Sequence, residues 1–230
     1  MVISGSVSNG PACRWRVDRV VTSAEEAHCF WPATGDLLPL ARLVDTVDSA
    51  VVFGSSTPAE EYSLAAITSA GYEVVRRRSG GGAVIVTPQD QLWLMLYLDS
   101  HDPLISSDLG RSFIWLGELF QRVIMDIAGL ELELVTERQP PTDGSRIACF
   151  AGLGFGELHV SGRKVLGLSQ RRSQGVVSFQ ASLLFVDRQA ELINFLRPSM
   201  PAPESAGLAE LCDFDRKLLV EAVISAITSR

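Results

Sequence analysis

A glycine-rich segment flanked by arginines is the first place in this sequence where a ligand could bind. Residues 76–84 read RRRSGGGAV. Glycines let the backbone approach a ligand closely, and consecutive N–H groups can hold an anion. Arginine side chains suit a carboxylate or a phosphate. The segment indicates either a binding loop or a flexible hairpin turn, and it matches neither a P-loop nor a dinucleotide-binding fingerprint.

A second segment places a lysine at the start of a predicted strand, directly after a tight turn. Residues 161–172 read SGRKVLGLSQRR, and Lys164 is one of only two lysines beside 18 arginines. Since ammonium and guanidinium are not equivalent, this favours a need for ammonium at position 164. Strand alternation predicts Leu166 and Leu168 on the face of Lys164, with Val165 and Gly167 on the other. Gly167 would leave room there for a thin ligand; the alternative is an ordinary surface hairpin.

Cys149 is the candidate nucleophile. Buried cysteines are usually structural, but a nearby ammonium or guanidinium would stabilise a thiolate and make it reactive. The four cysteines are scattered without metal-ligand spacing, so we predict neither a disulfide framework nor a metal site. They are Cys13, Cys29, Cys149 and Cys212. The three histidines form no motif, and we assign them no catalytic role: His28, His101 and His159.

Composition limits the class of protein. The chain has 230 residues, of which 47% are apolar and 20% charged, values typical of globular proteins. A net charge of −7 disfavours nucleic-acid binding. No apolar run approaches the roughly 20 residues of a membrane helix, and no signal peptide is visible, so we expect a cytoplasmic protein. Basic residues gather at 76–78, 163–164 and 171–172, as one anion site or as three separate solvated patches.

The elements that must position these residues are mixed. The predicted helices are one begun near Ser23, Pro58–Ala70, Asp108–Ala128, Ala190–Leu196 and a last one capped by Asp213. The predicted strands are Ala50–Gly54, Tyr72–Arg77, Ala83–Val86, Leu92–Leu98, Leu132–Thr136, Glu157–Val160, Lys164–Leu168 and Val176–Val186. Ala83–Val86 is expected to pair with Leu92–Leu98. Without regular βαβ alternation, the pattern favours an α+β domain with a mixed, largely antiparallel sheet.

The two motifs together resemble those of a known family. RRRSGGGAV and GRKVLGLSQRR are similar to the glycine-rich and lysine motifs of lipoate protein ligases and octanoyltransferases, of the biotin/lipoate protein ligase superfamily. They occur in the family's order. The resemblance implies one catalytic domain over residues 1–230, with residues 1–12 flexible and no C-terminal accessory domain. It also implies a tunnel for an eight-carbon acyl chain.

The resemblance also implies roles for individual residues. Lys164 would contact acyl-AMP in a ligase or polarise a thioester carbonyl in a transferase. Cys149 and Phe150 stand 15 residues before the lysine, like the nucleophile of the ligase-like cysteine octanoyltransferases. The implied substrate-binding residues are Arg76, Arg77, Ser79, Gly80, Gly81, Gly82, Ala83, Gly167, Ser169 and Gln170.

Three functions remain open from the sequence. The first is transfer of an octanoyl or lipoyl group from acyl carrier protein, through Cys149, to a lysine of a lipoyl domain, without a cofactor. The lipoyl domain would belong to a 2-oxoacid dehydrogenase or to the glycine cleavage H protein. The second is an ATP- and Mg²⁺-dependent lipoate protein ligase acting through lipoyl-AMP. The third is a non-catalytic module that binds lipoate or a fatty acid.

The chain also departs from the family's pattern. Val86 and Thr87 stand where members usually have a histidine after the glycine motif. Phe179 and Gln180 replace the residues that usually precede a G-S-L-L stretch, among them a histidine. The N-terminal N-M-A-x-D-E element has only a faint echo in residues 23–27. These departures bear on substrate choice and on activity.

Overall fold

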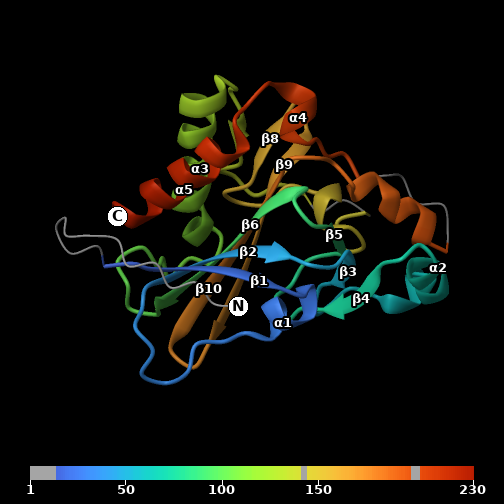
Figure 1. The fold of residues 1–230 in the computed structure, drawn as a ribbon, viewed down its shortest axis with the longest axis horizontal. Coiled ribbons are helices and arrows are strands. Elements are labelled where there is room, and N and C mark those ends of the chain that lie inside the picture. Colours follow the sequence, from blue (N-terminus) through green and yellow to red (C-terminus); the bar gives the residue numbers. More distant parts are fainter. Residues whose placement is uncertain (1–13, 141–143, 198–202) are drawn as a thin grey trace.

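The computed structural model of the chain describes residues 14–140, 144–197 and 203–230. The predicted flexible end at residues 1–12 lies outside the described residues. Two sheets and the helices around them make up the described fold (Figure 1).

The larger sheet has seven strands. Their spatial order is β1 (Arg16–Thr22), β2 (Leu40–Thr46), β6 (Gln91–Asp99), β10 (Val176–Leu184), β9 (Arg163–Ser173), β8 (Leu158–Val160) and β7 (Glu133–Leu134). Only β1 and β2 run parallel; every other neighbouring pair is antiparallel. The predicted α+β class with a mixed, largely antiparallel sheet is confirmed.

The smaller sheet has three strands in the order β4 (Glu73–Arg76), β3 (Ala50–Phe53) and β5 (Val84–Val86). The predicted pairing of β5 with β6 is wrong, because β5 pairs with β3 and the two strands belong to different sheets. The other edge of β5 is held by a side chain: Gln189 both accepts from Ile85 N and donates to Ile85 O, each at 2.9 Å. A side chain 104 positions away thus takes the place of a neighbouring strand.

Two helices cover one face of the larger sheet. These are α3 (Ile114–Ala128) and α5 (Arg216–Thr228), which pack against each other in Figure 1. Gly129, with a φ of 63°, ends α3 as predicted. The helix begins later than predicted because Asp108 Oδ1 accepts from the N–H groups of Gly110 and Arg111 and starts a short 3₁₀ turn instead. The cap of α5 is Asp215, which accepts from Leu218 N, and not the predicted Asp213.

The remaining helices are short. Ser23 caps α1 (Ala24–Cys29) as predicted. The helix predicted at Pro58–Ala70 is broken into a 3₁₀ turn (Ala59–Glu61) and α2 (Leu64–Ser69). Tyr62 separates them because it bridges Leu196 in extended conformation and donates its hydroxyl to Ile147 O. The others are 3₁₀ helices at Cys149–Ala151 and Gln189–Phe195 and the α-helix α4 (Leu208–Leu211).

The opposite face of the larger sheet packs against the smaller sheet and α1. Val52 and Val84 from the smaller sheet share one buried cluster with Trp93 and Met95 of β6. Burial of this apolar area stabilises the layered arrangement. The candidate site lies between the two layers, because its lining combines Val84 and Val86 of β5 with residues of β9 and β10.

Candidate active site

The glycine-rich loop joins β4 to β5 and is bound to the segment that carries Cys149. Cys149 N donates to Ala83 O at 2.8 Å, and Ala83 bridges Ala148 in a parallel register. A Cβ on Gly82 would lie 2.6 Å from the Ala148 carbonyl carbon. The absence of a side chain there lets the two backbones touch. The predicted binding loop therefore places Cys149.

The two predicted arginines of this loop have different surroundings. Arg76 is exposed and donates to Gly54 O at 3.0 Å, outside the pocket described below. Arg77 is buried and donates to Gly80 O and Gly82 O, at 3.0 and 2.9 Å. Its guanidinium thus shapes the loop and also lines the pocket.

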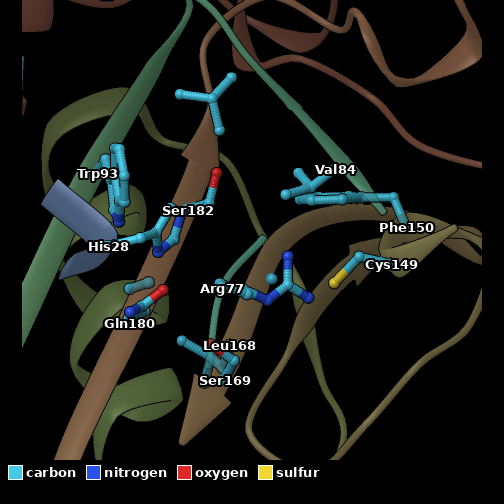
Figure 2. A pocket seen from close by; sticks show the side chains of 13 residues that line it. His28, Arg77, Val84, Trp93, Cys149, Phe150, Leu168, Ser169, Gln180 and Ser182 are labelled. Atoms are coloured by element: carbon cyan, nitrogen blue, oxygen red, sulfur yellow. The ribbon is translucent and has the colours of Figure 1, made fainter. Parts of the chain in front are cut away.

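Arg77 and Cys149 flank the same point of the loop. A Cβ built on Gly81, whose φ is +97°, would lie 2.8 Å from Arg77 Nη2 and 3.8 Å from Cys149 Sγ. Figure 2 shows the guanidinium beside the sulfur. The loop therefore brings a cationic side chain to the candidate nucleophile.

Lys164 is buried and has three oxygen acceptors. Its Nζ lies 2.7 Å from Glu157 Oε2, and it donates to Cys149 O at 2.8 Å and Gly152 O at 3.1 Å. The ammonium also lies 5.0 Å from the ring centre of Phe150. The lysine therefore fixes the backbone of the candidate nucleophile and of the turn that follows it, and its three N–H groups suit these three acceptors.

Glu157 is a site residue that the sequence did not reveal. Besides the ion pair, it accepts from Gly154 N at 2.7 Å and from Leu168 N at 3.0 Å. Buried charges are found in proteins when they are paired and hydrogen-bonded, and both partners here meet that condition. No motif flags a lone glutamate at this position.

A β-bulge sets the direction in which Lys164 points. In the pairing of β8 with β9, His159 faces Lys164 but Leu158 faces Leu166, so Val165 is an extra residue. Val165 and Leu166 consequently both lie in the core beneath α3 and α5. The predicted facing of Lys164 with Leu166 is wrong, since the lysine Cε lies 3.3 Å from where a Gly167 Cβ would be.

A cleft opens beside these groups. Thirteen residues line it: His28, Arg77, Val84, Val86, Trp93, Cys149, Phe150, Gly167, Leu168, Ser169, Gln180, Ala181 and Ser182 (Figure 2). Gly167 forms part of its wall, because a Cβ there would meet Phe150 Cζ at 3.0 Å. The cleft joins a candidate nucleophile to a largely apolar slot.

Other predicted residues fall beside the cleft or away from it. Ser79 is buried, and its hydroxyl lies 3.2 Å from that of Ser169, a lining residue. Gln170 does not reach the cleft, because strand alternation turns it toward Ser112, to which its Nε2 donates. Among the clustered basic residues, Arg163 pairs with Glu210 and Arg171 lies over Trp31. The three basic stretches therefore form no single anion site.

Comparison with known proteins decides the family. The lipoyl protein ligase A/B catalytic domain matches residues 23–229. The chain belongs to this family. Two similar curated proteins are octanoyltransferases LipM. That of an Exiguobacterium species is 28% identical over 164 residues, covering 69% of this chain and 59% of the relative. That of Brevibacillus brevis is 29% identical, covering 59% of this chain and 51% of the relative. The chain thus spans little more than half the length of these relatives.

Solved structures show the same fold. Lipoate-protein ligase A bound with ATP aligns with a TM-score of 0.65 at 21% identity, over 85% of this chain and 73% of that one. A bipartite ligase from Thermoplasma acidophilum, studied with its E2 lipoyl domain, aligns with a TM-score of 0.66 at 18% identity. The alignment covers 93% of this chain and 82% of that one. The expected lipoate ligase fold is confirmed.

Two of the four departures from the family's motifs lie at the cleft. Val86 and Gln180 both line the cleft, whereas Phe179 lies on the other face of the sheet against Phe113 and Trp115. Thr87 donates its hydroxyl to Asp90 in the turn before β6. The cleft of this family member therefore differs from the pattern at two positions that line it.

His28 lines the cleft and is a second site residue that motif analysis missed. It comes from α1, is 9% exposed and packs against Trp93 with ring centres 4.7 Å apart. Burial, assisted by the charge of Arg77, lowers the pKa of His28 to about 3. The imidazole is therefore neutral at physiological pH. The faint N-terminal motif at residues 23–27 precedes it directly, which was the available signal.

The described residues contain neither a metal-binding cluster nor a membrane-spanning helix. No group of three or more His, Cys, Asp or Glu side chains there could hold a metal ion. Within the same ranges, no helix combines the length and the apolar character needed to cross a membrane.

Proposed function

We propose that this chain is an acyltransferase of protein lipoylation that carries an octanoyl or lipoyl group on Cys149. One observation carries the proposal: Cys149 lines an apolar cleft beside the guanidinium of Arg77, on a loop held by Lys164. The names of the curated relatives support the same class of reaction.

In the first step, the Cys149 thiolate attacks the carbonyl carbon of an acyl carrier protein thioester. The carbonyl oxygen becomes negative in the tetrahedral intermediate, where the Arg77 guanidinium stabilises it, while Lys164 holds the backbone of Cys149 in place. The bond to the carrier sulfur then breaks, and the carrier thiolate takes up the proton that the Cys149 thiol lost. The acyl chain remains in the cleft.

In the second step, the neutral amine of a lysine on a lipoyl domain attacks the acyl-Cys149 carbonyl. Cys149 leaves as a thiolate and accepts the proton that the amine releases, so the thiol is restored. The thioester supplies the free energy, and no ATP is consumed. The acceptor class follows from the bipartite Thermoplasma ligase, which was studied with a lipoyl domain.

The direct test is the intact mass of the protein after incubation with octanoyl-carrier protein in the absence of ATP. We expect a gain of one octanoyl group, abolished in Cys149→Ser. Cys212→Ser is the matched control, because Cys212 donates to Leu208 O, away from the cleft lining, and should leave loading unchanged.

Two outcomes would replace the proposal. Formation of acyl-AMP from lipoate, ATP and Mg²⁺, without acyl-Cys149, would make the chain a ligase. Lipoate or fatty-acid binding without either product would make it a binding module.

A further inference from the structure

One end of the cleft is polar where an alkyl chain would need only carbon. His28 is 9% exposed and lines the cleft, and neither of its ring nitrogens has a hydrogen-bond partner among the described residues. A buried polar group without a partner costs free energy, so such groups in native proteins are normally satisfied. The imidazole is therefore a hydrogen-bonding group available to whatever occupies the cleft.

A second group of the same kind lies close to the first. Ser182 Oγ also lines the cleft, buried and without a partner in the described ranges. Ser182 is the register partner of Trp93, against which His28 packs. Gln180 lies two residues along β10, on the same face, and lines the cleft too. Three polar side chains from α1 and β10 thus meet at one place.

This polar end is separate from the reacting end. Figure 2 shows His28, Ser182 and Gln180 on one side of Arg77, with Cys149 and Phe150 on the other. An acyl chain joined to Cys149 would run past the Gly167 wall, and its far part would meet the polar groups. The position of these three side chains suits recognition of the acyl chain and not of the thioester group.

The charges at this end select the kind of group that fits. Burial, and secondarily the charge of Arg77, lowers the pKa of His28 to about 3, so the ring is neutral, with one donor and one acceptor nitrogen. A serine hydroxyl and a glutamine amide also both donate and accept. Three neutral groups of this type match an uncharged oxygen substituent.

We propose that the acyl group selected by this cleft carries a hydroxyl or oxo oxygen on its chain, bound by His28, Ser182 and Gln180. The inference rests on the proposed acyl-transfer function and refines its substrate from a plain octanoyl chain to an oxygenated chain of similar length. A site built to bind an oxygen rejects the analogue that lacks it, because its buried polar groups are then left unpaired.

The experiment measures binding without transfer. Octanoate, 6-hydroxyoctanoate, 8-hydroxyoctanoate and 6-oxooctanoate are titrated into the Cys149→Ser protein by calorimetry. We expect at least one oxygenated acid to bind about tenfold more tightly than octanoate or better. Equal binding of all four acids would overturn the proposal and would mean that solvent satisfies these side chains.

Two variants show whether the polar side chains cause the preference. His28→Leu and Ser182→Ala, each made in Cys149→Ser, should bring the affinity ratio close to one while retaining octanoate binding. A merely structural role would weaken all the acids equally and leave the ratio unchanged, which also overturns the proposal. If His28→Leu does not fold, the affinity ratio measured with Ser182→Ala still tests the proposal.

The binding ratio and the proposed function fail independently. Octanoyl loading of Cys149 together with an affinity ratio of one would support the transferase function and contradict the preference for an oxygenated acyl chain. A high ratio without any acyl-Cys149 would retain the binding preference and sink the transferase.

Discussion

Glu157 and Lys164 form a buried ion pair of 2.7 Å directly beneath the backbone that carries Cys149. The ammonium binds the Cys149 carbonyl, and the carboxylate binds the Leu168 and Gly154 N–H groups. One pair of charges therefore joins β9 to the loop of the candidate nucleophile. Its position makes stability and reactivity depend on the same two side chains.

Removing the carboxylate charge should destabilise the fold. Glu157→Gln leaves the Lys164 ammonium buried without its anion, and breaking such a pair typically costs about 3–5 kcal/mol. We expect a loss of that order in the free energy of unfolding, measured by urea denaturation. Glu133→Gln, at a largely exposed carboxylate 3.6 Å from His159, is the control and should change stability little. Equal stability of both variants would contradict the structural role of the pair.

Arginine should not replace Lys164. The site offers three oxygens to a compact ammonium, and a planar guanidinium cannot meet them in the same geometry. We expect Lys164→Arg to slow acyl loading of Cys149 by roughly 100-fold, because a shifted backbone would misplace the nucleophile. Lys217→Arg changes the other lysine of the chain and should load at the wild-type rate. Wild-type loading by Lys164→Arg would mean that positive charge alone suffices.

The conformation of Gly81 should matter for reactivity beyond its strain. Gly81→Ala and Gly71→Ala both place alanine at positive φ, which costs roughly 1–2 kcal/mol. The added methyl group at 81 would lie 2.8 Å from Arg77 Nη2, whereas at 71 it meets no atom within 4 Å. Both variants therefore share the strain of a positive φ, but only Gly81→Ala also displaces Arg77, so only Gly81→Ala should lose acyl loading. Equal acyl loading by the two variants would mean that the conformation of the loop at Gly81 does not affect the reactivity of Cys149.

Acidification should destabilise the protein through His28. Its pKa falls from 6.5 to about 3 because of burial and, secondarily, of Arg77. Between these values the unfolded chain binds a proton that the folded chain does not, so the free energy of unfolding decreases as pH falls. Linkage predicts a loss of about 2 kcal/mol from pH 7 to pH 5, measured by urea denaturation at both values. His28→Leu should remove this loss.

The exposed His101 provides the control for that titration. His101→Leu should keep the pH dependence of the wild type. If both histidine variants retained it, the acid sensitivity would have to come from other groups.

Local signals predicted the parts of the fold that local chemistry decides. Ser23 caps α1 and Gly129 ends α3, as their residue types indicate. The edge of β5 could not be predicted in this way, because the side chain that holds it, Gln189, is distant in sequence. Tyr62 likewise interrupts a helical pattern through partners near residues 147 and 196.

The residues of the candidate site also differ in whether local sequence predicts them. The motifs identified Arg77, Gly167 and Cys149, all of which line the cleft. They missed His28 and Glu157, since an isolated histidine or glutamate carries no spacing that indicates its neighbours. Such residues become recognisable only when the fold brings separate segments together.

The bulge at Val165 has a consequence for how relatives of this chain are identified. Three positions separate Lys164 from Gly167, and in a regular strand an odd separation would place them on opposite faces. A relative that lost one residue between them could retain both the lysine and the glycine and still match the motif. Its ammonium would nevertheless point to the opposite face of the sheet. For this segment, the number of residues is thus as informative as their identity. An alignment that ignores a one-residue gap there would hide the loss of the site.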